Sequence, residues 1–298
     1  ITTLRGDKFN YQLSSKGTII EINDQIVIVF RIHEMPRQAK PIYFGGDIRN
    51  TFVRQGSTDQ KASKEEIERF LRDASSFSSD SMIAEGVTID DLDPDTIQGY
   101  RRYIEARDSS HPFLKLGDNE FLRKLGCIHD EGITIAGLAL FGSEDSIARR
   151  LPSFELNIYE MPEDVSSEER YLDRKIYNEN LVTTYLDSIA YLKKFIKIPF
   201  KLSDDGITRL EMVPSYIAVR EALANLLMHR DYFERGFAAI RIYPKHITFR
   251  NPGPSLLSID EILTGAETAP RNPIIARAFR LAGWAELAGS GMLKIMGQ

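Results

Sequence analysis

Residues 214–229 have the sequence PSYIAVREALANLLMH, and this stretch decides the expected fold of the C-terminal third of the chain. Pro214 suits the first turn of a helix, and the Ala and Leu residues that follow favour its continuation. At about 100° per residue, the apolar residues cluster on one face, while Glu221, Asn225 and His229 lie within about 80° of each other on the other. The pattern predicts a helix with a core face and a second face that carries a carboxylate, an amide and an imidazole.

This polar row has two interpretations. It is either the solvated side of an ordinary amphipathic helix, or part of a nucleotide site. In such a site the Glu221 carboxylate can orient and deprotonate water, and the Asn225 amide oxygen is a hard ligand for Mg²⁺ beside the phosphates. The sequence downstream favours the second interpretation, because Gly253, Gly289 and Gly291 let backbone N–H groups approach phosphate oxygens.

Patterns elsewhere predict an α+β chain. Two β-branched stretches flank Asn23-Asp24 and predict a hairpin over 18–32, and residues 42–44 and 51–54 predict a second strand pair. Ser63 and Glu66 form a capping-box pattern at the start of a helix. Further helices are expected near 95–107, 113–125, 181–196, 258–263 and 273–282, and further strands at 132–142, 154–159, 238–243 and 247–250.

Composition excludes several classes of protein. A formal net charge of -5 argues against coating nucleic acid non-specifically, and no apolar run is long enough to span a membrane. One cysteine and five histidines make a disulfide framework and a zinc site poor expectations, and favour a reducing cytoplasm. Because the chain starts at Ile1 and a helix that opens near Gly289 is cut off at Gln298, we expect a part of a longer protein.

Four motifs occur in one order, and their order is more specific than any one of them. They are REALANLLMHRDY (220–232), RNPG (250–253), RNPIIA (271–276) and ELAGSGM (286–292). Together they resemble the C-terminal domain of transcriptional regulators often labelled helicase-related, a domain similar to the GHKL ATPases of gyrase, MutL and histidine kinases. Residues 51–63 resemble the closing segment of a Schlafen-type AlbA-like domain, and residues 136–142 match the family's middle segment.

The resemblance implies three parts. These are a truncated, β-rich AlbA-like domain at 1–80 that contacts nucleic acid and lacks its N-terminal part, a connecting α/β segment at 81–170, and a GHKL-like α/β sandwich at 171–298. It implies ATP and Mg²⁺ as cofactors, Glu221 as the water-activating base and Asn225 as the metal ligand. The expected nucleotide contacts are Asn225, His229, Asn251, Gly253, Arg271, Asn272, Gly289 and Gly291.

Three features depart from the GHKL pattern. Asn251 stands where these ATPases use an aspartate to receive the adenine amino group, and an amide recognises that group less selectively. Pro254 occupies a position where a second glycine is expected, and the lid between Gly253 and Gly289 is short and lacks a glycine-rich phosphate wrap. Two alternatives follow: a domain that binds ATP with weak hydrolysis at most, or a non-enzymatic dimerisation or ligand-sensing module with a degenerate pocket.

Two further sets of residues have two interpretations each. Arg271 and Asn272 precede Pro273 at a helix start, where they can reach a phosphate or cap the helix. Basic residues in the β-rich N-terminal part suit either a DNA or RNA contact face or a solvated sheet edge. These residues are Arg31, Arg37, Lys40, Arg49 and Arg54.

The function expected from these patterns is that of a cytoplasmic regulator. Its AlbA-like domain contacts DNA, its GHKL-like domain binds ATP, and its homo-oligomerisation depends on nucleotide occupancy. The non-enzymatic module is the alternative. A Schlafen-like nuclease is a third, but its acidic residues belong to the part of the N-terminal domain that we expect to be missing.

Overall fold

The computed structural model describes residues 8–12, 17–32, 35–75, 77–163, 170–196, 214–256 and 270–285. Its contacts divide the chain into two compact units, Ile1–Phe77 and Ser78–Gln298. No helix in the described ranges is long and apolar enough to cross a membrane.

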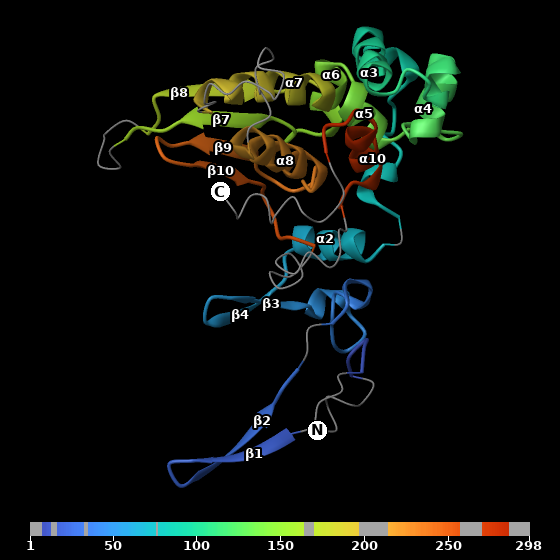
Figure 1. Cartoon of the computed structure of the whole chain (residues 1–298). Coiled ribbons are helices and arrows are strands. Elements are labelled where there is room, and N and C mark those ends of the chain that lie inside the picture. Colours follow the sequence, from blue (N-terminus) through green and yellow to red (C-terminus); the bar gives the residue numbers. More distant parts are fainter. Residues whose placement is uncertain are drawn as a thin grey trace. The chain divides into compact units, whose positions relative to one another are not determined.

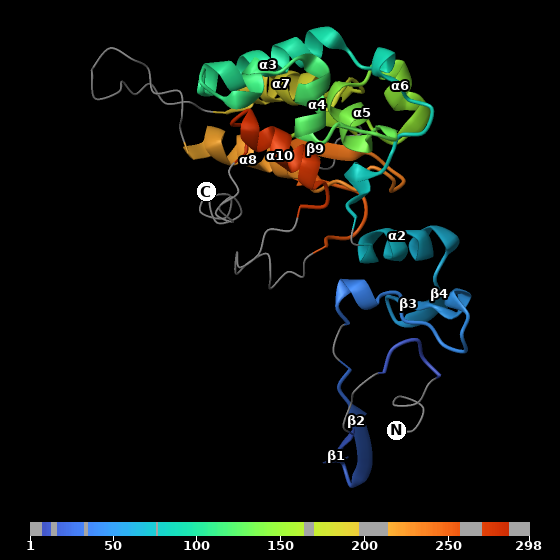
Figure 2. The same ribbon diagram turned by 90° about the vertical axis from the view of Figure 1, so that its right-hand side faces the viewer.

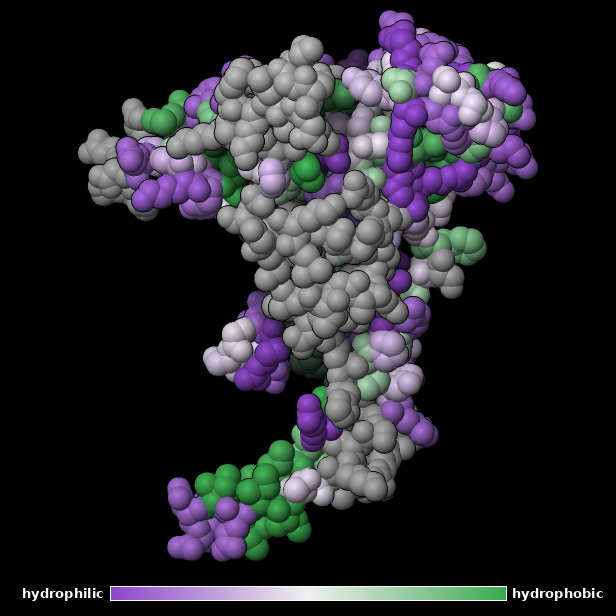
Figure 3. Space-filling view, viewed as in Figure 1, coloured by the Kyte–Doolittle hydropathy of each residue, from purple (hydrophilic) through white to green (hydrophobic). Residues whose placement is uncertain are grey.

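The first unit contains the predicted hairpin, formed by β1 (Gly17–Ile22) and β2 (Gln25–Phe30). Asn23 and Asp24 make the two-residue turn with φ of 51° and 58°, a backbone conformation that matches the right-handed twist of the flanking strands. Aliphatic side chains cover this hairpin, where Ile19 is 71% and Ile26 76% exposed, and they form the apolar cluster in Figure 3. Neither hairpin face is therefore buried by the described residues of the chain.

The second predicted strand pair differs from expectation. Residues 42–44 contribute only two isolated bridges, Tyr43 to Thr51 and Phe44 to Phe9, and β3 (Phe52–Gln55) instead pairs with β4 (Thr58–Lys61). Gly56 has φ +62° in the turn between them, which glycine adopts without steric cost. The short helices η1 (Arg37–Ala39) and η2 (Ile48–Asn50) precede this pair, and α2 (Lys64–Ala74) follows it with the predicted Ser63–Glu66 capping box.

A four-stranded sheet is the centre of the second unit. Its strands are β7 (Leu156–Glu160), β8 (Asp173–Tyr177), β9 (Ala238–Ile242) and β10 (Ile247–Arg250), in the order β10-β9-β7-β8. β7 runs parallel to β9, and the two outer pairs are antiparallel. The predicted α+β fold class is confirmed. The segments 81–170 and 171–298 both contribute strands to this sheet, and the domain boundaries stay predictions.

One face of the sheet is covered by α7 (Leu181–Leu192) and α8 (Pro214–Met228), as Figures 1 and 2 show from two sides. The register places Ile158 beside Ile240 and Ile240 beside Phe249, so these apolar side chains share one face. Tyr159 and Arg241 belong to the opposite face, where the Arg241 guanidinium lies 5.7 Å from the Tyr159 ring centre. The alternation along β9 thus directs its apolar residues towards the helices.

The remaining described helices of this unit gather beyond one end of the sheet (Figure 1). They and the short strands among them share one hydrophobic core with the sheet. These elements are η3 (Ser79–Ser81), η4 (Ile89–Asp91), α3 (Pro94–Arg107), η5 (Pro112–Lys115), α4 (Asp118–Leu125), β5 (Ile128–His129), β6 (Gly132–Ile133), α5 (Ile135–Phe141), α6 (Glu144–Arg150) and α10 (Pro273–Leu281). The short helix η6 (Lys193–Phe195) instead continues α7.

The strand predicted over 132–142 is wrong. Only β6 is extended, and the chain then enters α5, in which all seven residues are buried. Thr134 caps this helix, because its hydroxyl accepts a hydrogen bond from the Gly137 N–H. A helix that is apolar on every side shows no 3.6-residue periodicity, so its sequence looks like a buried strand.

The predicted C-terminal helix, α10, is held by residues from the start of the second unit. The buried Asp80 carboxylate accepts hydrogen bonds from Ile274 N (2.8 Å) and Ile275 N (3.1 Å) at the first turn. Further along, the Tyr100 hydroxyl donates to the Ala278 carbonyl at 2.7 Å, and Arg107 donates to the Arg280 carbonyl. Segments almost 200 residues apart in sequence are thereby fixed side by side.

Candidate functional site

The three residues of the predicted polar row of α8 differ in their burial. Glu221 is 1% exposed, Asn225 is half-buried and His229 at the end of the helix is exposed. The apolar residues Leu223 and Leu227 on the other face are completely buried in the core. Only the C-terminal half of the row is therefore accessible to a ligand from solvent.

Glu221 lies in an interior, charged environment between α7 and α8. Its Oε1 is 3.7 Å from an Arg220 guanidinium nitrogen, and its negative charge contributes to a raised pKa of the Tyr185 hydroxyl, for which burial is the main cause. A buried carboxylate keeps its charge when a cation lies close to it. The arrangement explains how Glu221 is retained inside the molecule.

Two asparagine amides lie at the accessible part of this region. The Asn251 side-chain N–H donates to the Leu226 carbonyl at 2.7 Å, which places this residue beside the turn of α8 that carries Asn225. Asn251 Oδ1 is buried and has no hydrogen-bond partner among the described residues. Asn225 likewise has none within the ranges described above. A buried acceptor without a partner is uncommon and fits a site that receives a donor from a ligand.

His229 and Gly253 lie at the edge of the same region. Desolvation, and next the positive charge of Arg271, lower the pKa of His229, although part of the side chain is exposed to solvent. The imidazole is therefore neutral at pH 7. Gly253 has φ +79°, and an added Cβ atom would come within 3.1 Å of the Glu234 side chain, so the predicted loop requires glycine here.

Arg271 and Asn272 bind the interior of the protein. Arg271 pairs with Asp231 at 3.4 Å and donates to the Pro254 carbonyl at 3.1 Å, and both members of the ion pair are almost completely buried. Asn272 donates to the carbonyls of Met228 (3.0 Å) and Arg230 (2.7 Å). These bonds join the start of α10 to the end of α8. This structural role is neither of the two predicted ones: Asn272 is the N-cap residue of α10 but its side chain makes no capping hydrogen bond. The phosphate contact of both residues stays a prediction.

Other predicted positions fall outside the description. Gly289, Gly291 and the helix expected over 258–263 lie outside the described residues. Within the described ranges, no group of three or more His, Cys, Asp or Glu side chains is arranged to hold a metal ion. A Mg²⁺ ion bound by Asn225 would need its other ligands from phosphate oxygens and water, which is the usual arrangement for this ion.

The predicted basic residues of the first unit differ in their partners. Arg49 forms a bidentate pair with Asp47, whose pKa its hydrogen bonds lower to about 2, and Arg54 pairs with Asp59 at 2.9 Å. Arg31, Arg37 and Lys40 lie in or near the segment between β2 and β3. Local acidic residues therefore neutralise Arg49 and Arg54, which lessens their attraction for phosphate.

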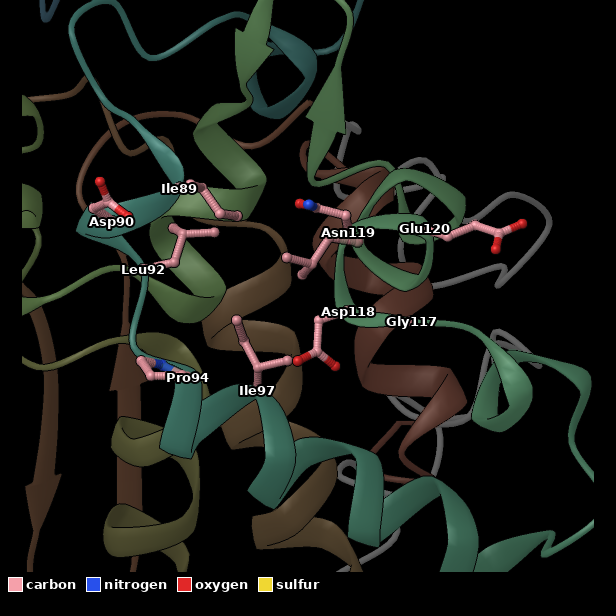
Figure 4. A pocket seen from close by; sticks show the side chains of 10 residues that line it. Ile89, Asp90, Leu92, Pro94, Ile97, Gly117, Asp118, Asn119 and Glu120 are labelled. Atoms are coloured by element: carbon pink, nitrogen blue, oxygen red, sulfur yellow. The ribbon is translucent and has the colours of Figure 1, made fainter.

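Two clefts in the second unit lie away from α8. One of about 710 Å³ is formed by η4 and the first turns of α3 and α4; Figure 4 shows Ile97 and Asp118 side by side in it. Asp118 is neutralised there by Arg101 at 3.3 Å. The other, about 670 Å³, contains Arg107, Arg277 and Arg280. Sequence inspection missed this second group, although Arg277 and Arg280 are three residues apart and so share a face of a predicted helix.

Comparisons with known proteins find a family match that begins after α8 and covers β9, β10 and α10. Residues 237–298 match a family described as "Putative ATP-dependent DNA helicase recG C-terminal". Residues 68–157 match a domain of unknown function, DUF8451. The C-terminal part of the chain is thus similar to an ATPase-like domain of a helicase-related family, as the motifs indicated. A search of curated proteins finds no significant match.

A solved structure has a similar fold. The DIP2311 protein from Corynebacterium diphtheriae superposes with a TM-score of 0.54 at 22% identity, covering 95% of this chain and 54% of that one. The chain thus spans about half the length of the structure it matches. At this identity the likeness concerns the fold alone.

Proposed function

We propose that the chain belongs to a transcriptional regulator that binds ATP with Mg²⁺ at the end of α8, and that this binding controls its contact with DNA. The observation that carries the proposal is the pair of asparagine amides described above, one half-exposed and the other with a buried carbonyl oxygen that lacks a partner among the described residues. The family match over 237–298 supports a nucleotide as the ligand.

The orientation of Asn251 supports recognition of an amino group. Its N–H₂ group is used on the Leu226 carbonyl, so the atom left for a ligand is Oδ1, an acceptor. An aspartate at this position would accept from the adenine amino group in the same way. The predicted loss of selectivity for the adenine amino group is therefore limited, because the hydrogen bond to the Leu226 carbonyl keeps the Asn251 N–H₂ group away from the ligand.

Hydrolysis is less well supported than binding. A general base must reach a water molecule beside the γ-phosphate, and Glu221 is buried next to Arg220. This observation favours the second candidate function, a ligand-sensing or dimerisation module with weak turnover at most. Both functions share the binding step.

Calorimetric titration of the whole chain with Mg-ATP tests that step. We expect Asn225→Ala to weaken binding about tenfold or more, since it removes a contact to a charged group. Glu221→Gln should leave the affinity nearly unchanged and abolish any turnover. Asn119→Ala, at an exposed asparagine in the cleft of Figure 4, is the matched control. A wild-type chain without affinity at millimolar Mg-ATP would refute the proposal.

In this proposal the first unit, which resembles a Schlafen-type AlbA-like domain, contacts DNA. The chain acts as a homo-oligomer. Fluorescence anisotropy with a labelled DNA duplex measures DNA binding, and its comparison with and without Mg-ATP measures the effect of the nucleotide on that binding. Arg37→Ala should weaken binding more than Arg49→Ala or Arg54→Ala does, because Asp47 and Asp59 already neutralise the latter two. Equal losses would contradict this assignment.

A further inference from the structure

The 670 Å³ cleft of the second unit lies where the last turns of α3 and α10 meet the segment around Phe113. The Tyr100–Ala278 hydrogen bond joins α3 to α10. One wall comes from the part of the chain that matches the domain of unknown function, and the other from the ATPase-like part. Its volume is within the usual range for small-molecule sites.

Positive charge exceeds negative charge in this cleft. Three arginines, Arg107, Arg277 and Arg280, line it together with one carboxylate, Asp108. Ser110 donates to Asp108 through its N–H (3.0 Å) and its hydroxyl (2.6 Å), and these bonds lower the pKa of that carboxyl. Within the described part of the chain, none of the three arginines forms an ion pair with a carboxylate. Three unneutralised guanidinium groups in one cleft repel each other and attract an anion.

Most donors of these arginines remain available. Arg107 uses one nitrogen on the Arg280 carbonyl, and Arg280 uses its Nε on the Ala276 carbonyl at 3.4 Å. Arg277 makes no hydrogen bond to a described residue, and its guanidinium carbon lies 5.7 Å from the centre of the Phe113 ring. Because a guanidinium has five N–H donors in a planar fork, each can still bind two phosphate oxygens.

The backbone allows Arg107 to lie close to the end of α10. Gly283 has φ +76°, and a Cβ atom there would come within 3.1 Å of Arg107 Cδ and 3.2 Å of its Nη1. Any other residue at 283 would therefore displace this arginine. His111 adds a donor, since its Nδ1 accepts from the Phe113 N–H at 3.2 Å and the proton of the neutral ring is then on Nε2.

The floor of the cleft is apolar. Ile104 is buried, and the ring of Phe113 and the side chain of Leu281 pack against the core. An inorganic anion would leave this surface in contact with water, whereas a planar ring would cover it and stack on Phe113 or on a guanidinium. The combination of arginines and an aromatic floor selects a ligand that has both a phosphate and a ring.

We propose that this cleft binds a nucleoside monophosphate or a related small ligand, with its phosphate on Arg277 and Arg280 and its ring over Phe113. This site is separate from the one on α8 and goes beyond the proposed function. It requires no metal ion, because the arginines supply the positive charge.

Titration of the whole chain with AMP in the presence of EDTA tests the proposal. AMP should bind more tightly than inorganic phosphate, and adenosine should not bind measurably. The double substitution Arg277→Ala with Arg280→Ala should lower the AMP affinity at least about tenfold, whereas Arg102→Ala on the exposed side of α3 should not change it. Both arginines are exposed, so circular dichroism should show an unchanged fold for the double variant.

The two proposed sites give different outcomes. Loss of AMP binding in the double arginine variant, with retention in Asn225→Ala, supports the cleft. Retention in the arginine variant with loss in Asn225→Ala assigns the ligand to α8 and overturns the present proposal. Absence of AMP binding in EDTA at millimolar concentration also overturns it, but leaves Mg-ATP binding at α8 untouched.

Discussion

Single buried polar residues hold the second unit together, and Asp80 is the most consequential of them. It is completely buried, and its carboxylate accepts the two backbone N–H groups at the first turn of α10. Arg230 has a similar function, because its guanidinium binds the carbonyls of Ser153, Phe154 and Glu155 before β7. Each side chain connects elements that are distant in sequence.

Asp80 predicts a specific pH dependence of stability. Burial raises its pKa above the ordinary aspartate value of about 3.9. The folded state therefore binds this proton more tightly than the unfolded state, and the resulting stabilisation is complete below pH 3.9 and is lost as the pH rises through the raised pKa. Asp80→Asn keeps an acceptor and removes the titration. Urea unfolding should show the stability of Asp80→Asn relative to wild type increasing from about pH 4 to pH 7.

Asp91 provides a control of opposite sign. Hydrogen bonds from Ser146 first, and then from the Thr88 N–H, lower its pKa to about 2. Its stabilisation is present above the ordinary pKa and is lost as the pH falls towards 2. Asp91→Asn should therefore lose stability relative to wild type as the pH rises from about 2 to about 4, below the pH range in which Asp80→Asn gains. A difference in the free energy of unfolding between Asp80→Asn and wild type that does not change with pH would contradict a raised pKa of Asp80.

At the scale of elements, the sequence predicted those with local signals. The α8 helix, the β9–β10 hairpin and the Asn23-Asp24 turn all follow from periodicity or turn chemistry, and the structure confirms them. The α5 helix does not, because burial on all sides removes the periodicity that distinguishes a helix from a strand. Pairing partners such as β3 with β4 were also missed, since two adjacent strand patterns do not specify which neighbour each one chooses.

Gly137 shows why α5 has its composition. A Cβ atom at this position would lie 2.3 Å from the Cys127 carbonyl oxygen, so the helix approaches the chain before β5 more closely than any side chain allows. Gly137→Ala should therefore lower the free energy of unfolding by about 2 kcal/mol or more. At Gly99 in α3 the nearest atom is the end of Arg102, 3.8 Å away, and Gly99→Ala should raise it by roughly 0.5–1 kcal/mol. Chemical denaturation of both variants checks this, and equal effects would refute it.

At the scale of the whole molecule, the surroundings of the predicted site residues depend on tertiary packing. The position of the α8 row follows from helix geometry, but the depth of Glu221 depends on α7 and Arg220, whose packing no local pattern encodes. Arg271 and Asn272 carried motif letters typical of a ligand site, and tertiary contacts bind both to the interior. The arginine cleft joins residues about 170 positions apart, so only the folded chain could reveal it.

The two units differ in how much hydrophobic core they contain, and this difference predicts their behaviour when separated. Among the described residues, the core cluster runs from Ala84 to Ala285 and includes no residue of the first unit. A fragment of residues 78–298 should therefore unfold cooperatively with a midpoint within about 3 °C of that transition in the whole chain. Calorimetry and circular dichroism measure the transitions of the fragment and of the whole chain. Loss of the cooperative transition in the fragment would contradict the division of the chain into two units.

A fragment of residues 171–298 tests the predicted domain boundary directly. It retains β8, β9 and β10 but lacks β7, which lies between β8 and β9 and pairs with both. It also lacks Asp80, Tyr100 and Arg107, the three residues that hold α10. Without its central strand the sheet is divided, and the exposed edges and apolar face should cause aggregation. We expect this fragment not to fold; a cooperative transition for it would establish 171–298 as an independent domain.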